Sequence, residues 1–241
     1  MGFFGRKRAP SVPHPRKEPR FDGPLTLERL EQIFQDCVDF TKRPVSLGEG
    51  GACTLTLCYL SGMVKMERVS DYVLRPLAQD EALARCGTPR QAMEEMMGGA
   101  MYNLSAAERT TLDEAAFDLV AGWCLLFFPG ESAVLSLFVG TEEKRSISSP
   151  SNETVLKGSR DAFVESLRTN TSLVRRHLKA PELKIKEQTV GRQSLTLVDI
   201  VYIEGIADPE IVKRLEERLA AIDIDAALTA GSLEEYLTDQ S

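Results

Sequence analysis

The two histidines of the chain are the first test of whether it could carry out nucleophilic catalysis. A serine or cysteine nucleophile needs a general base held beside it, and imidazole is the usual base. His14 lies in a proline-rich N-terminal stretch, and His177 falls at the end of a predicted helix, where the helix dipole favours a cation. Neither position suggests a base oriented toward a nucleophile, so we predict no catalytic site and expect that the chain is not an enzyme.

Metal and phosphate chemistry have equally little support. The five cysteines and two histidines show no C-x-x-C or H-x-x-x-H spacing, which zinc sites of thiolate and imidazole ligands usually have. The glycine-rich stretch GEGGA (48–52) precedes a predicted strand and lacks a lysine, whereas a phosphate-binding loop follows a strand and opens a helix. We therefore predict no metal and no cofactor, and interpret 48–52 as a flexible turn.

A basic stripe on one predicted helix, residues 160–178, is the most informative polar pattern. Its outer face carries four polar residues at helical spacing and one more beside them: Arg168, Ser172, Arg175, Lys179 and Arg176. Asp161 and Glu165 lie one to two turns earlier. The stripe is either an exposed, ion-paired face or a docking surface where guanidinium groups add specificity, and the sequence leaves both interpretations open.

The elements that would position these side chains fall into two groups. The first holds a helix over 25–40 with Thr26 as N-cap, a strand over 53–60, helices over 63–77, 80–97 and 106–122, and a hairpin of strands 123–128 and 133–140. The second holds the helix that ends at residue 178, strands 183–190 and 194–204, a helix from Pro209 capped by Asp208, and a short helix at 232–237.

We therefore predict the α/β class, with two small mixed α/β subdomains joined by a polar linker and preceded by a disordered basic arm. The expected boundaries are 1–24 for the arm, 25–147 for the N-terminal subdomain and 153–241 for the C-terminal one, with a cleft or hinge between the two. A length of 241 residues with 43% hydrophobic content suits two small cores.

One sequence pattern occurs in both predicted subdomains. The string YLSGMVKMERV from Tyr59 matches YIEGIADPEIV from Tyr202, and each follows an apolar strand and opens a helix. Duplication and convergent strand-to-helix packing both explain the match. Gly62 and Gly205 would serve the two strand exits, and Gly191 the turn of the second hairpin.

Charge is unevenly distributed along the chain. The formal net charge of -7 argues against nucleic acid as a partner, yet residues 1–20 hold six basic residues against one acidic residue. This arm is either a solvated tail or a contact for an anionic membrane surface. The longest apolar run, GWCLLFF, is too short to cross a bilayer, and five cysteines without a secretory signal indicate reduced thiols.

The C-terminal half resembles the signature region of the spore germinant receptor A-subunit (GerA) family. The matching motifs are ETVLKGSRDAF (153–163), ESLRTN (165–170), LVRRHL (173–178), PELK (181–184), TVGR (189–192), YIEGIADPE (202–210) and IDID (222–225). A weaker similarity extends back through LCYLSGMV and VLRPL.

The resemblance implies a cytoplasm-facing domain of a spore inner-membrane protein that acts in receptor assembly and nutrient-germinant signalling. It implies a membrane B subunit, a lipoprotein C subunit and self-association as partners, with membrane contact only through a C-terminal region beyond Ser241. It also implies a candidate partner or coupling surface: Arg160, Glu165, Arg168, Asn170, Arg175, Arg176 and Arg192. A small-nutrient pocket between the lobes and a domain of a related spore ion-channel component stay open as alternatives.

Overall fold

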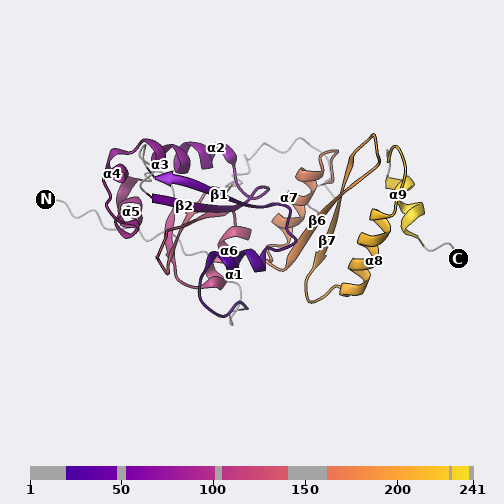
Figure 1. Cartoon of the computed structure of the whole chain (residues 1–241), viewed down its shortest axis with the longest axis horizontal. Helices are drawn as coiled ribbons and strands as arrows, with labels where there is room; N and C mark the ends of the chain where they lie inside the picture. Colours follow the sequence, from indigo (N-terminus) through magenta and orange to yellow (C-terminus); the bar gives the residue numbers. More distant parts are fainter. Residues whose placement is uncertain (1–19, 48–52, 101–104, 141–161, 228–229, 239–241) are drawn as a thin grey trace, which may run out of the picture.

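The computed structural model describes residues 20–47, 53–100, 105–140, 162–227 and 230–238. Most of the N-terminal arm, the turn 48–52 and the linker 142–153 lie outside them. The described elements form two units of different size, each built on its own antiparallel sheet, side by side along the long axis of the molecule (Figure 1).

The larger unit contains a five-stranded sheet in the order β1-β2-β4-β5-β3. Its strands are β1 (Phe40–Leu47), β2 (Cys53–Leu60), β3 (Ala106–Arg109), β4 (Trp123–Phe127) and β5 (Val134–Phe138). Every pairing is antiparallel, and β4 and β5 form the hairpin that the sequence predicts. The central strands are buried on both faces, which explains why they read as nearly continuous apolar runs.

Helices cover both faces of this sheet. One layer consists of α2 (Met66–Val69), α3 (Arg75–Gln79), α4 (Glu81–Ala84) and α5 (Pro89–Glu95), with π-helical turns at Ser70–Leu74 and Met96–Ala100. The other consists of α1 (Leu27–Ile33) and α6 (Leu112–Val120), on the opposite side in Figure 1. Cys53 packs against the first layer and Cys58 lies in the core under the second, so the two thiols of β2 face opposite sides of the sheet.

The smaller unit is a hairpin between helices. Strands β6 (Leu183–Val190) and β7 (Thr196–Ile203) pair along their whole length, and α7 (Leu167–His177) lies against β7. On the other face α8 (Pro209–Ala220) places Leu215 and Leu219 against Val190 and Ile200, and α9 (Ala230–Leu237) packs on α8. Thr26 and Asp208 are the N-caps that the sequence predicts.

Three sequence predictions about the elements are wrong. The stretch Ala106–Arg109 is an edge strand paired with β5, because cross-strand bonds prevail over the helix propensity of AAER. The first helix ends at Ile33, and the chain then enters β1, which the polar sequence FTKRPVSL did not reveal. The helix predicted over residues 160–178 begins only at Leu167 and ends at His177; Phe163, before it, is 72% exposed, and Leu178, after it, is also exposed.

Candidate functional site at the junction of the two sheets

The two sheets are joined by backbone hydrogen bonds. The Val38 N–H donates to the Ile185 carbonyl at 2.9 Å, and the Ile185 N–H donates to the Asp36 carbonyl at 3.0 Å. Cys37 and Ile185 thereby form a parallel bridge between the loop after α1 and the strand β6. The smaller unit therefore continues into the larger one through main-chain contacts, in addition to its covalent connection.

A buried guanidinium reinforces this junction. Arg175 on α7 is 1% exposed; its Nε donates to Asp39 Oδ2 at 2.6 Å and its Nη2 donates to Asp39 Oδ1 at 2.9 Å. The remaining Nη1 donates to the Leu183 carbonyl at 3.1 Å. Burial by itself lowers the pKa of Arg175, but hydrogen bonds to Asp39 and its negative charge outweigh burial, so the pKa is raised and the group stays charged.

Asp39 is in turn fixed by the larger unit. Its carbonyl accepts the Ser61 N–H at 2.9 Å and the Ser61 hydroxyl at 3.2 Å, at the end of β2. Because its carboxylate faces a guanidinium on the other unit, both charges are compensated although both are removed from water. The pair therefore ties α7 to the end of the central sheet.

A second buried cation crosses the same junction. Lys184 on β6 donates through Nζ to the Ile33 carbonyl at the end of α1 at 2.5 Å, and pairs with Glu204 at 3.2 Å. Cys37 lies beside Lys184, and its Sγ is 3.5 Å from the Leu183 carbonyl oxygen. Burial raises the pKa of this thiol, and Arg175 partly opposes the effect.

Arg20 also connects the two units. Its backbone N–H donates to the Asp113 carboxylate at 2.9 Å, and its side chain pairs with Glu182 of the smaller unit.

Gly62 allows α7 to approach the larger unit closely. A Cβ built on Gly62 would overlap the Ser172 hydroxyl and would lie 3.2 Å from the Ser172 Cβ. The role of Gly62 is therefore close contact rather than a positive φ angle. Gly191 and Gly205, in contrast, have φ angles of 92° and 80°, as turn glycines do.

The structure corrects the prediction that Arg175 lies on an outer face of its helix. The face that carries Arg175 points into the junction, because the loop around Asp39 covers it. Arg168 is half-exposed, and it pairs with Glu187 and, at 3.6 Å, with Asp199 on the hairpin. Arg160 lies outside the described residues.

The other predicted surface residues divide into local and exposed roles. Asn170 accepts the Val164 N–H at 2.8 Å and donates to its carbonyl at 2.7 Å, which fixes the chain before α7. Arg192 pairs with Asp223 beside the hairpin turn. Glu165 and Arg176 are exposed. Of the predicted set, only Arg175 contributes its side chain to the bonds described above between the units.

Asp39 and Lys184, which complete the junction, were not among the residues predicted from the sequence. A lysine at 184, among the apolar residues at the start of a strand, was the signal available for one of them. Asp39 lies between Val38 and Phe40, in a stretch that reads as the end of an amphipathic helix, where a carboxylate is unremarkable. Nothing in the neighbouring sequence indicates that Arg175, 136 positions away, pairs with Asp39 and covers it.

A surface depression of about 480 Å³ opens beside the junction. It is lined by Asp36, Cys37, Val38, Ile185, Lys186, Glu187, Gln188 and Glu216. Lys186 pairs there with Glu216 at 2.7 Å and Asp36 at 3.3 Å, and the hydrogen bond to Glu216 is the main reason its pKa is raised. The lining of the depression thus combines the Lys186 ammonium with carboxylates from both units.

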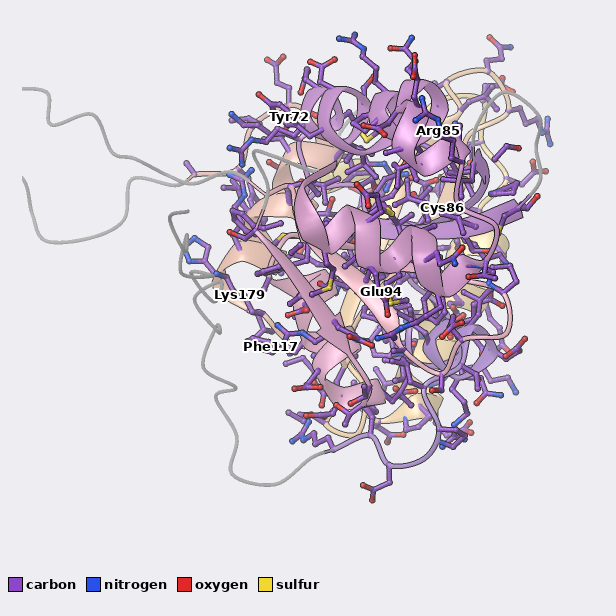
Figure 2. All side chains as sticks on the ribbon, turned by 90° about the vertical axis from the view of Figure 1, so that its left-hand side faces the viewer. Tyr72, Arg85, Cys86, Glu94, Phe117 and Lys179 are labelled. Carbon is purple, nitrogen blue, oxygen red and sulfur yellow. The ribbon has the colours of Figure 1, made fainter. Side chains whose placement is uncertain are left out.

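A smaller and less polar pocket, of about 340 Å³, lies far from the junction. It is lined partly by Leu47, Cys53, Leu83 and Cys86, near the α4–α5 end of the molecule, where Figure 2 shows Cys86 and Glu94. Within the described residues, no group of three or more His, Cys, Asp or Glu side chains is placed to hold a metal ion. Nor does that part of the chain contain a helix of the length and apolarity needed to cross a membrane.

Comparisons with known proteins place these features in context. The family model described as Bacillus/Clostridium GerA spore germination protein matches residues 28–241. Two similar proteins of Bacillus subtilis are the uncharacterized membrane protein YfkQ, 34% identical over 89% of this chain and 40% of that protein, and spore germination protein KA, 32% identical over 84% and 37%. The chain thus spans about two fifths of the length of these relatives.

A solved structure shows the same fold. The crystal structure of the N-terminal domain of the A subunit of the Bacillus megaterium spore germinant receptor GerK3 aligns with a TM-score of 0.67 and 25% identity, covering 92% of this chain and 82% of that one.

Proposed function

Because the chain belongs to the GerA family of Bacillus and Clostridium spore germination proteins, we propose that it assembles a germinant receptor and relays the nutrient signal within it. The proposal places it on the cytoplasmic side of the spore inner membrane, as a domain of an A subunit. A membrane B subunit and a lipoprotein C subunit are its proposed partners.

The buried Arg175–Asp39 pair is the observation that supports the relay. It is bidentate, and main-chain bonds between Val38 and Ile185 run beside it. On this proposal a displacement of α7 or of the hairpin is carried to the end of the central sheet, because separating the pair would leave a buried charge without its partner. A module that only bridged two partners would need no such rigid connection between its halves.

The exposed side of α7 is the proposed partner surface. It retains Glu165 before the helix and Arg168 and Arg176 on it, whereas Arg175 is committed to the junction. The surface combines both charge signs, which suits a partner with complementary charges and disfavours wrong partners.

Charge reversal on this surface tests the proposal. Spores whose gene carries Glu165→Lys with Arg176→Glu should contain less receptor complex on affinity purification and should germinate more slowly with nutrients. The matched control exchanges the charges of Lys213 and Glu217, an exposed pair on α8. Normal complex and normal germination, with folding intact by circular dichroism, would reject the surface.

The depression at the junction favours a second candidate, a small-nutrient binding module. Its ammonium and carboxylates from both units would hold a zwitterionic or polyhydroxylated nutrient. Titration calorimetry of the 241-residue chain with amino acids, sugars and nucleosides is the test. Flat traces at millimolar ligand would reject this function without affecting the relay.

A further inference from the structure

In the described part of the chain, the sheet edges formed by β1, β3 and β7 differ in how they are protected against pairing with another chain. The β1 edge carries Lys42, Arg43 and Pro44, and β3 has only four residues, two of them charged. Charge, proline and short length are the usual protective features of an edge strand. The β7 edge, TLVDIVYI, has eight residues with no lysine, arginine or proline.

The single charge on β7 is turned away from solvent. The Asp199 side chain is 2% exposed and pairs with Arg168 of the same chain. The edge therefore offers a long row of main-chain groups, and its one charged side chain is buried beside Arg168 rather than exposed to solvent.

The outer side of β7 is also unpaired. In the described residues β7 pairs with β6 and with no other strand. Among those residues, main-chain bonds outside the ladder reach β7 only at the Ile203 carbonyl, which accepts from Ile206 and Ala207 in the turn that follows. The N–H and carbonyl groups that point outward are thus available to another strand.

Large apolar side chains accompany this open edge. Leu197 and Val201 share one face of β7 and are 47% and 38% exposed. Leu195, just before the strand, is 64% exposed, and Ile206, just after it, is 79% exposed. Their spacing places one strongly exposed apolar residue at each end of the strand and two between them.

We propose that β7 pairs antiparallel with β7 of a second copy of this chain, around a two-fold axis at Ile200. In this register Leu197 lies opposite Ile203 of the other copy, and Asp199 lies opposite Val201.

Three features favour a second copy over an unrelated strand. Two pairs of apolar positions are symmetric about Ile200, Leu197 with Ile203 and Val198 with Tyr202, so the strand is complementary to itself there. No charge is placed directly opposite a like charge, because the two Asp199 residues are offset and each has its own Arg168. One two-fold contact pairs the β7 edges of both copies with each other and leaves neither of them open for further growth.

Sedimentation equilibrium of the 241-residue chain over a micromolar to submillimolar range tests the proposal. The wild type should form a dimer and nothing larger, and Leu197→Lys with Val201→Lys should weaken dimerisation on the order of tenfold or more. The matched control Met97→Lys changes an exposed apolar residue of the larger unit and should leave the dimer intact. A monomer at every concentration, an open-ended series of larger species, or a dimer that tolerates both lysines would overturn it.

Amide hydrogen exchange on the wild type keeps the proposal testable if the lysine variant folds poorly. Residues 196–203 should become more protected as protein concentration rises, while β1 should not change. Concentration-dependent protection of β1, or no change in either strand while a dimer forms, would show that another surface associates.

Discussion

The guanidinium of Arg175 and the carboxylate of Asp39 form a bidentate ion pair between two sheets, although they are 136 residues apart in sequence. Removing both groups from water costs free energy, which their mutual hydrogen bonds and the Leu183 carbonyl offset. The arrangement therefore stabilises one relative placement of the two units and penalises others, because separation would leave a buried charge without its partner.

Removing one member of this pair should destabilise the whole chain. Arg175→Ala and Asp39→Ala are each expected to lower the free energy of unfolding by about 3–5 kcal/mol, whereas Asp39→Leu with Arg175→Met should cost less because no charge is left alone. Urea denaturation measures all three. Lys213→Ala, which breaks an exposed pair, is the control and should cost about 0–1 kcal/mol; equal costs for Arg175→Ala and Lys213→Ala would contradict the role of burial.

The sequence predicted the interior of each unit better than the contact between them. The apolar strands 123–128 and 133–140 and the caps Thr26 and Asp208 are local signals, and each is confirmed. Edge strands are weaker signals: β1 contains Pro44 and two cations, and β3 has only four residues. Their pairing depends on partners distant in sequence.

The junction was not predictable from helical spacing. Spacing shows that Arg168, Ser172 and Arg175 share one side of α7, but it does not show what covers that side. In the structure the turn at Gly62 and the loop at Asp39 cover its C-terminal part, so an apparently exposed arginine is buried and a glycine assigned to a turn serves close packing.

Gly62 provides a separate test of this packing. Gly62→Ala would place a methyl group against the Ser172 side chain and is expected to cost about 1–3 kcal/mol of unfolding free energy. Ser172→Ala in the same chain should recover part of that loss. Gly98→Ala, where no atom lies within 4 Å of the added Cβ, is the control; thermal or urea unfolding should show it to be neutral, and a neutral Gly62→Ala would contradict close contact.

Asp199 should make stability depend on pH. Burial raises its pKa, with Arg168 partly opposing the effect, so the folded state holds this proton more tightly than the unfolded state. The stabilisation is complete below the unfolded pKa and is lost as the pH rises through the folded pKa. Asp199→Asn should remove this pH-dependent contribution to the free energy of unfolding, which urea denaturation measures between neutral pH and about pH 4.

The matched control for Asp199 is Asp71→Asn, which changes an exposed aspartate that pairs with Arg75. Loss of this exposed pair should cost about 0–1 kcal/mol of unfolding free energy. An identical profile for Asp199→Asn and wild type would mean that burial of Asp199 has no effect on its protonation.

Cys37 should report opening of the junction. It is buried beside Arg175, whereas Cys53 and Cys86 are partly exposed, and burial raises the pKa of Cys58 and Cys124 to about 12. In mass-spectrometric alkylation we expect Cys53 and Cys86 to react first. Arg175→Lys, which keeps the charge but loses the bidentate fork, should accelerate labelling of Cys37 and leave Cys58 and Cys124 unchanged. Equal acceleration at all three would indicate global unfolding instead.

The most direct test of the account is the nutrient-triggered germination rate of spores whose gene carries Arg175→Lys, with Arg85→Lys, which changes an exposed arginine at the end of α4, as the control. If rigid coupling between the units relays the signal, Arg175→Lys spores should contain the chain at the wild-type level yet lose optical density more slowly, and Arg85→Lys spores should match the wild type. Wild-type germination in Arg175→Lys spores, with faster Cys37 labelling in the purified variant, would contradict the account.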